Sequence, residues 1–187
     1  MVSRAMRRWV LPLLCAFLLS GCATGYLLDN QVQSFSGLAT LPAQPGYRFE
    51  RLPSQQQPAQ AQLEALADAA LHRAGLRRDD AAPAFSVLVS ARIQRAISPW
   101  ADPWEWGWGG GFWSPFGRMQ QPWFVREVTV VVRELAGNRV LFESRALNEG
   151  PWLAPPLVLP AMFDAALQGF PNPPTGVRRV DIQLGAR

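Results

Sequence analysis

Hydrophobic and polar side chains alternate along five segments of this chain, with the two-residue period of half-buried β-strands. The five segments are residues 47–52, 86–93, 125–135, 139–147 and 177–184. The side chains predicted to face one buried side of a sheet are Tyr47, Phe49, Val87, Val89, Ala91, Ile93, Val128, Val130, Val132, Val140, Phe142, Ser144, Ala146, Val180, Ile182 and Leu184. Ala-Gly-Asn at 136–138 joins the third and fourth segments and predicts a β-hairpin.

Two further segments repeat hydrophobic residues with the period of an α-helix. Residues 58–74 carry one apolar stripe, formed by Leu63, Leu66, Ala67, Ala70, Leu71 and Ala74. Pro58 suits a first helical turn, and Gly75 suits the left-handed position after a helix. Residues 160–168 predict a second helix, which Gly169 ends. Its buried side chains are predicted to be Met162, Phe163, Ala166 and Leu167.

The order of these elements is strand, helix, three strands, helix, strand. This order predicts an α+β fold, in which a mainly antiparallel sheet carries two helices on one face. Residues 46–187 are expected to form a single domain with an insert at 98–123. Residues 22–45 are polar, and only 31–38 show periodicity, so we predict a tether and a first strand whose ends the pattern does not define.

The insert contains six of the eight tryptophans of the chain, interrupted by glycine and proline. In an extended chain its even-numbered tryptophans would face the same way. The candidate binding surface consists of Trp100, Trp104, Trp106, Trp108, Trp113, Trp123 and Arg118. Indole rings suit stacking on sugar rings, a position at the lipid headgroup boundary, or the anchoring of a protein partner. Alternatively, the tryptophans cover the domain's own sheet, or the insert is a spacer.

The N-terminal residues have the organisation of a secretory signal. Three arginines within residues 1–9 precede ten apolar residues at 10–19, about half of the roughly 20 that span a membrane. Leu-Ser-Gly-Cys follows and resembles the lipobox of bacterial lipoproteins. That resemblance implies that residues 1–21 are removed and that Cys22 carries lipid, including palmitate. Because residue 23 is Ala rather than Asp, we predict the periplasmic face of a Gram-negative outer membrane.

Composition excludes several kinds of chemistry. Cys15 lies in the signal and Cys22 carries the predicted lipid, so no cysteine remains for a disulfide, a nucleophile or a metal ligand. From Cys22 onward 15 arginines face 14 acidic residues, whereas nucleic-acid binding requires clustered positive charge. The chain has no lysine, which excludes Schiff-base catalysis and a P-loop lysine.

The remaining polar residues do not form a recognisable catalytic set. His72 is the only histidine, and it falls on the polar side of the first helix, where we expect a solvated side chain. Asp79 and Asp80 follow two arginines and predict a solvated charge run in a loop. Asp102 and Glu105 could serve as paired glycosidase carboxylates, but nothing in the insert sets their separation. We therefore predict a protein without catalytic activity, metal site or cofactor.

Several pieces of the chain together resemble a known family. They are the segment Tyr-Arg-Phe-Glu-Arg-Leu-Pro at 47–53, the insert at 104–113, the hairpin at 125–145 and Leu-Gln-Gly-Phe-Pro at 167–171. With the lipobox, they resemble the bacterial lipoproteins grouped as domain of unknown function 4136. The resemblance implies a fold and a location, but no activity.

We therefore expect an outer-membrane-anchored periplasmic lipoprotein with a binding or structural role. Its partners would be the membrane, through the lipid on Cys22, and an envelope protein or glycan, with no nucleic acid. The alternative is a glycan-binding module that uses the insert to bind sugars of peptidoglycan or lipopolysaccharide.

Overall fold

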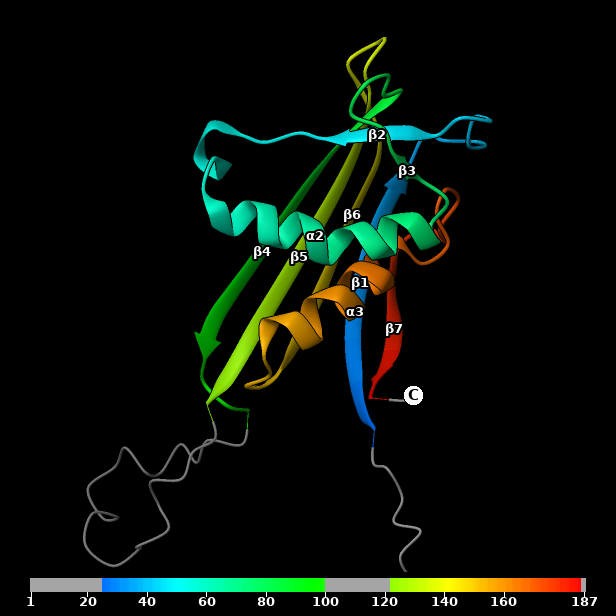
Figure 1. Cartoon of the computed structure of the whole chain (residues 1–187). Coiled ribbons are helices and arrows are strands. Elements are labelled where there is room, and N and C mark those ends of the chain that lie inside the picture. The colour runs from blue at the N-terminus through cyan, green and yellow to red at the C-terminus, as the bar shows by residue number, and fades with distance from the viewer. Residues whose placement is uncertain (1–24, 100–121, 186–187) are drawn as a thin grey trace, which may run out of the picture.

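The computed structural model describes residues 25–99 and 122–185, which form a seven-stranded sheet with two helices across one face (Figure 1). The order of strands in the sheet is β3-β2-β4-β5-β6-β1-β7. The strands are β1 (Tyr26–Ser36), β2 (Gly46–Phe49), β3 (Arg77–Arg78), β4 (Phe85–Ala96), β5 (Trp123–Glu134), β6 (Arg139–Pro151) and β7 (Val177–Leu184). The helices are α2 (Pro58–Arg73) and α3 (Pro155–Leu167), and η1 (Pro53–Gln55) is a short 3-10 turn.

The predicted α+β class is confirmed, and the sheet is mixed. β2 runs parallel to β3 and to β4, and the other paired strands are antiparallel. α2 lies between β2 and β4 in the chain, so it forms the crossover that two parallel neighbours require. The β-hairpin is also confirmed, with Asn138 in the left-handed conformation (φ 50°) that asparagine tolerates in turns.

β1 begins earlier than the periodic segment at 31–38 from which a first strand was predicted. It begins at Tyr26 and lies between β6 and β7. Leu28, Asn30 and Val32 are its fully buried side chains, so a polar residue interrupts the hydrophobic alternation. The Asn30 side-chain amide donates to the carbonyl oxygens of Leu28 and Val180, at 3.1 Å each. These bonds allow asparagine at a buried position. A polar residue at this position breaks the hydrophobic alternation by which the sequence would indicate the strand.

The charge run predicted for a loop is partly a strand. Arg77 and Arg78 form β3, in which Gly46 pairs with Arg77. The carboxylate of Asp79 accepts the backbone N–H groups of Ala81 and Ala82, at 3.0 Å each. Asp79 and Asp80 lie in a loop, and Arg77, Arg78 and Asp80 are exposed, as predicted. Only the placement of the two arginines in the loop was wrong, because pairing with a strand distant in sequence defines β3.

α2 confirms the first predicted helix to within one residue, and α3 begins five residues earlier than predicted. Pro160 lies inside α3 rather than at its start. Proline is tolerated in a first turn but removes one backbone hydrogen bond further in. Burial of Val158 and Leu159, which precede it, offsets that loss (0% and 5% exposed).

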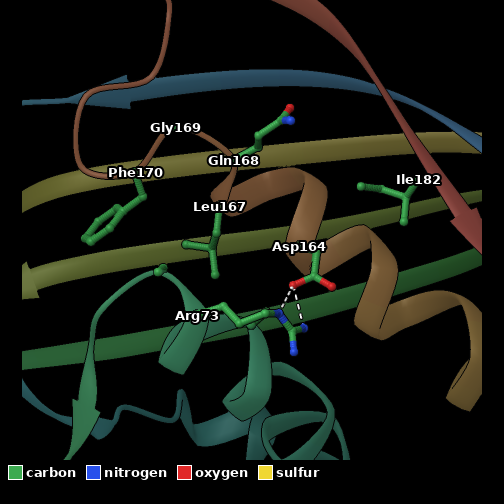
Figure 2. Close-up of a pocket in the computed structure, with 9 residues that line it drawn as sticks. Arg73, Asp164, Leu167, Gln168, Gly169, Phe170 and Ile182 are labelled. Carbon is green, nitrogen blue, oxygen red and sulfur yellow. Dashed lines mark hydrogen bonds and ion pairs between the residues drawn. The ribbon is translucent and has the colours of Figure 1, made fainter. Parts of the chain in front are cut away.

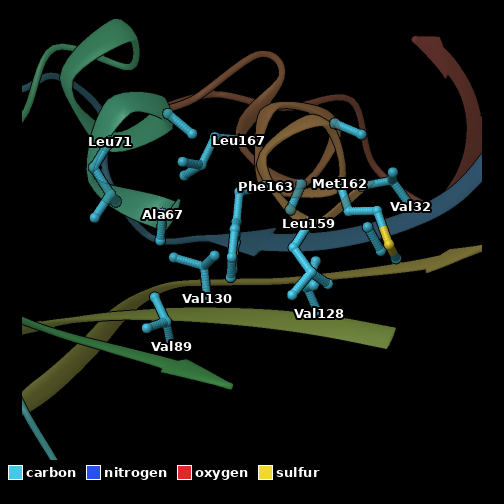
Figure 3. Packing of buried hydrophobic residues seen from close by; sticks show 14 of the residues in the cluster. Val32, Ala67, Leu71, Val89, Val128, Val130, Leu159, Met162, Phe163 and Leu167 are labelled. Carbon is cyan, nitrogen blue, oxygen red and sulfur yellow. The ribbon is translucent and has the colours of Figure 1, made fainter. Parts of the chain in front are cut away.

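The core lies between the helices and the sheet (Figure 3). Phe163 points from α3 toward β5, near Val130 and Ala67. The predicted inward side chains that are fully buried here are Tyr47, Val87, Val89, Val128, Val130, Val132, Phe142, Ser144 and Ala146. Others predicted inward, including Ala91, Ile93 and Val140, are only partly buried.

Ser144 has a structural reason to be inside the core. Its hydroxyl donates to the carbonyl oxygen of Ala166 at 2.6 Å, in the last turn of α3. Arg178 of β7 donates to the carbonyl oxygen of Gln168 at 2.9 Å, just beyond that turn. Helix ends leave carbonyl groups without intrahelical partners, so these two side chains cap α3 and join it to the sheet.

Tyr47 links β2 to α2. Its side chain is fully buried, and its hydroxyl donates to the carboxylate of Asp68. Burial, and next the hydrogen bond to Asp68, raise the pKa of Tyr47 far above its usual value of 10.0. Tyr47 therefore remains protonated in the folded protein at a pH where an unfolded tyrosine ionises.

Stability is expected to fall above pH 10.0, the ordinary tyrosine value, because only the unfolded state then releases this proton. For a single proton the slope is at most about 1.4 kcal/mol per pH unit. At neutral pH the free energy of unfolding of Tyr47→Phe should be about 1 kcal/mol lower, because the variant lacks the hydrogen bond to Asp68. Above pH 10.0 its stability should decline less steeply with pH, because the variant has no hydroxyl proton to release. Urea unfolding measured at several pH values tests this. Tyr26→Phe is the control, and an unchanged slope in Tyr47→Phe would contradict the assignment.

Candidate functional site

Most of the predicted site residues lie outside the part of the chain that the structure describes. These residues are Cys22, Trp100, Trp104, Trp106, Trp108, Trp113 and Arg118, together with Asp102 and Glu105. Trp123 is described, and it is the half-buried first residue of β5. Pro99 and Pro122, between which the undescribed part of the insert runs, are both exposed.

His72 lies on the exposed side of α2, as predicted. Its backbone carbonyl accepts a hydrogen bond from Arg77 at 2.9 Å. In residues 25–99 and 122–185 no cluster of histidine, cysteine and acidic side chains could hold a metal ion.

Several strand ends meet at one end of the sheet (Figure 1). Ala96, the last residue of β4, pairs with Trp123, which in turn pairs with Pro151 at the end of β6. At the same end, Tyr26 begins β1 and pairs with Leu184 of β7. Antiparallel pairing thus gathers residues from five separate parts of the sequence.

A buried arginine joins three strands at this end. The Arg126 side chain of β5 is 1% exposed and donates to the side-chain oxygen of Asn148 at 3.0 Å and to the carbonyl oxygen of Pro151. Asn148 of β6 then donates to the carbonyl oxygen of Asp29 in β1 at 2.7 Å. This chain of bonds ties β5, β6 and β1 together where the strands end.

The guanidinium of Arg126 forms no ion pair with any carboxylate of the described residues. Burial therefore lowers its pKa from the usual value. Its Nε atom has no hydrogen-bond partner there, although the charge lies 5.8 Å from the centre of the Phe124 ring. Because its charged group is buried, Arg126 stabilises the fold and is not available to bind a ligand at the surface.

Aromatic rings pack over this series of hydrogen bonds. Phe124 and Trp152 pack edge to face, with ring centres 5.0 Å apart. Gly150 allows close approach of another ring, because a Cβ at this position would lie 3.0 Å from the hydroxyl oxygen of Tyr26. The end of the sheet is therefore a packed aromatic layer over hydrogen-bonded strands.

Large hydrophobic side chains are exposed around that layer. We call the set the apolar end; it consists of Tyr26, Leu27, Ile97, Trp152 and Leu157, which are 38%, 54%, 84%, 53% and 50% exposed. This surface offers apolar contact area and aromatic polar groups rather than catalytic groups. Sequence reasoning missed all five residues, since they are isolated in sequence and only the fold brings them together.

A pocket of about 490 Å³ lies between the last turns of the two helices and β7 (Figure 2). Arg73 of α2 donates to one carboxylate oxygen of Asp164 in α3, at 2.6 and 2.9 Å. Leu167, Phe170 and Ile182 supply apolar walls. The two charged groups neutralise each other, and the other lining residues supply no nucleophile or base. The pocket therefore offers no catalytic arrangement.

In the described ranges, neither helix combines the length and the apolar character of a membrane span.

No family model and no curated protein matches the chain. The resemblance to domain of unknown function 4136 thus stays a prediction. Among solved structures, PelC dodecamers from Paraburkholderia phytofirmans in two crystal forms are similar, with a TM-score of 0.48, 13% identity and coverage of 74% of this chain and 94% of that chain. A PDZ domain protein from Parabacteroides distasonis has a TM-score of 0.49 and 11% identity, over 90% of this chain and 42% of its own. At these scores neither similarity assigns a function.

Proposed function

We propose that this protein is a lipoprotein of the bacterial envelope, anchored through Cys22 to the periplasmic face of the outer membrane, and that it binds or supports other envelope components without catalysis. The observation that carries the proposal is the position of β1. This strand begins at Tyr26, four residues after the predicted acylation site. The domain therefore starts almost directly at the anchor.

The distance from anchor to domain follows from covalent geometry. Four extended residues span at most about 14 Å. A lipoprotein with so short a connection is held next to the headgroups and cannot reach across a wide periplasm. A binding or structural role close to the membrane fits this geometry.

The side chains described here support a non-catalytic role. His72 is exposed on α2, and the acidic group in the pocket between the helices is paired with Arg73. A general base or nucleophile requires a second group that activates it. Neither His72 nor Asp164 has such a partner among the described residues.

Acylation of Cys22 is directly testable in envelopes that express the full chain. Mass spectrometry of the purified protein should find an N-terminal peptide that starts at Cys22 and carries acyl chains. Cys22→Ser should lack these chains and move out of the outer-membrane fraction. Cys15→Ser is the matched control, because it changes a cysteine within the predicted signal. Retention of residues 1–21 in the native protein would refute the proposal.

A further inference from the structure

We propose that the apolar end docks on the phospholipid surface of the membrane, so that the strands stand with this end toward the headgroups. The inference rests on the proposed acylation of Cys22 and assigns a lipid-facing surface to the folded domain. It concerns only Tyr26, Leu27, Ile97, Trp152 and Leu157, and it specifies the orientation of the protein in addition to its anchoring.

The exposed hydrophobic side chains have an uneven distribution. Of eight large hydrophobic residues that are exposed among the described residues, five belong to the apolar end. The other three, Phe35, Leu52 and Val177, lie away from it, at the end of β1, after β2 and at the start of β7. Grouped exposed apolar side chains usually mark a surface that another apolar phase covers.

Charged side chains have the opposite distribution. The strand ends and loops far from the apolar end carry Arg48, Glu50, Arg51, Arg77, Arg78, Asp79, Asp80, Arg133, Glu134 and Arg139. Near the apolar end, Arg92, Arg95 and Glu149 are exposed, Asp29 is exposed but paired with Arg179 at 3.0 Å, and Arg126 is buried, so fewer charged side chains lie at this end. Charged groups are costly to move into a membrane, so the charge-poor end is the one that suits contact with lipid.

The proposed lipid anchor is attached close to the same end of the sheet. Tyr26 and Leu27 belong to the apolar end, and Tyr26 is four residues from Cys22. The span of at most about 14 Å compares with a headgroup layer of about 5–8 Å on each side of the membrane. With the lipid inserted, these side chains are held close to the headgroups in every orientation of the short connection.

The chemistry of the surface matches the membrane boundary. Tyrosine and tryptophan favour this region because each joins an apolar ring to a polar group, and Tyr26 and Trp152 are both partly exposed. A lipid anchor gains strength and orientation from a second contact. The hydrogen bonds of Arg126 and Asn148 hold the strand ends that present these side chains.

A site-specific fluorescent label tests the docking in the full, acylated protein. Cys22 is the only cysteine after the predicted cleavage, so an introduced cysteine can be labelled alone. Leu157→Cys places an environment-sensitive label at the apolar end, and Leu52→Cys places it away from that end. The two leucines are a matched pair, since they are 50% and 49% exposed. Ile97→Cys and Val177→Cys form a second pair in case one variant does not fold.

The labelled proteins are reconstituted in vesicles of phosphatidylethanolamine and phosphatidylglycerol. A phospholipid that carries a nitroxide near its headgroup should quench the label at position 157 strongly and leave the label at 52 nearly unchanged. Iodide in the water should show the reverse order, with quenching at 157 reduced several-fold.

Three outcomes overturn the proposal. Equal quenching of both positions, in a protein shown to be acylated and to float with the vesicles, refutes the docking but leaves the proposed function intact. Protection of position 157 from iodide without quenching by the nitroxide lipid assigns the apolar end to a second copy or another protein. A chain that is not acylated and does not float refutes the proposed function, and the docking with it.

Discussion

Replacing Phe163 with alanine is expected to lower the free energy of unfolding by about 3–5 kcal/mol. Phe163 is fully buried where α3 meets the sheet, near Val130 and Ala67 (Figure 3). The substitution removes buried apolar area and leaves a cavity, which two helices joined to the sheet by hydrogen bonds cannot close completely. Urea unfolding followed by circular dichroism measures the loss.

Leu157→Ala is the matched control for this variant, because Leu157 lies in the same helix and is 50% exposed. Its loss should stay below about 1 kcal/mol. Similar losses for the two variants would contradict the placement of Phe163 in the core.

Replacing Arg126 with alanine is expected to cost about 3 kcal/mol or more. The side chain is 1% exposed, so alanine leaves a large gap. It also leaves the acceptors on Asn148 and Pro151 without their donor. The aromatic layer at the end of the sheet then loses its support, and urea unfolding should report the loss.

Arg126→Met separates the packing of this side chain from its charge. Methionine keeps a long apolar stem and removes a desolvated cation that has no carboxylate partner among the described residues. Replacing a buried charge with a hydrophobic residue of similar volume is often nearly neutral. We therefore expect Arg126→Met to retain most of the stability that Arg126→Ala loses. If methionine is as damaging as alanine, the hydrogen bonds of the guanidinium are the dominant contribution.

The regular elements were predicted well where the pattern is local. Val128, Val130 and Val132 alternate and are all fully buried on β5. Ala67, Ala70 and Leu71 repeat with helical spacing and face the core from α2. Burial on one face imposes a period of two residues on a strand and of 3.6 on a helix, so a single segment carries the signal.

Elements that depend on distant partners were predicted poorly. β3 has two residues and exists through its pairing with β2. The start of β1 was missed because Asn30 is buried, and its partners include the carbonyl oxygen of Val180 in β7. α3 begins before Pro160 because packing of Val158 and Leu159 offsets the missing hydrogen bond.

The candidate site shows the same division. Sequence composition pointed to the insert and to Cys22, where a motif or an unusual residue content is visible along the chain. The apolar end has no such signal, because Tyr26, Ile97 and Trp152 are separated by long stretches of sequence. Arg126 likewise fell within a strand where its burial could not be anticipated.

The amino-acid sequence by itself determined the α+β class, most strands and both helices, and it predicted a lipid-anchored protein that lacks thiol and lysine chemistry. The tertiary structure decided the strand order, the buried polar bonds that cap α3 and join the strand ends, and the grouping of exposed hydrophobic residues beside the start of β1. The reason is physical: hydrophobic periodicity is a property of neighbouring residues, whereas strand pairing and surface patches arise from contacts between residues that are distant in sequence.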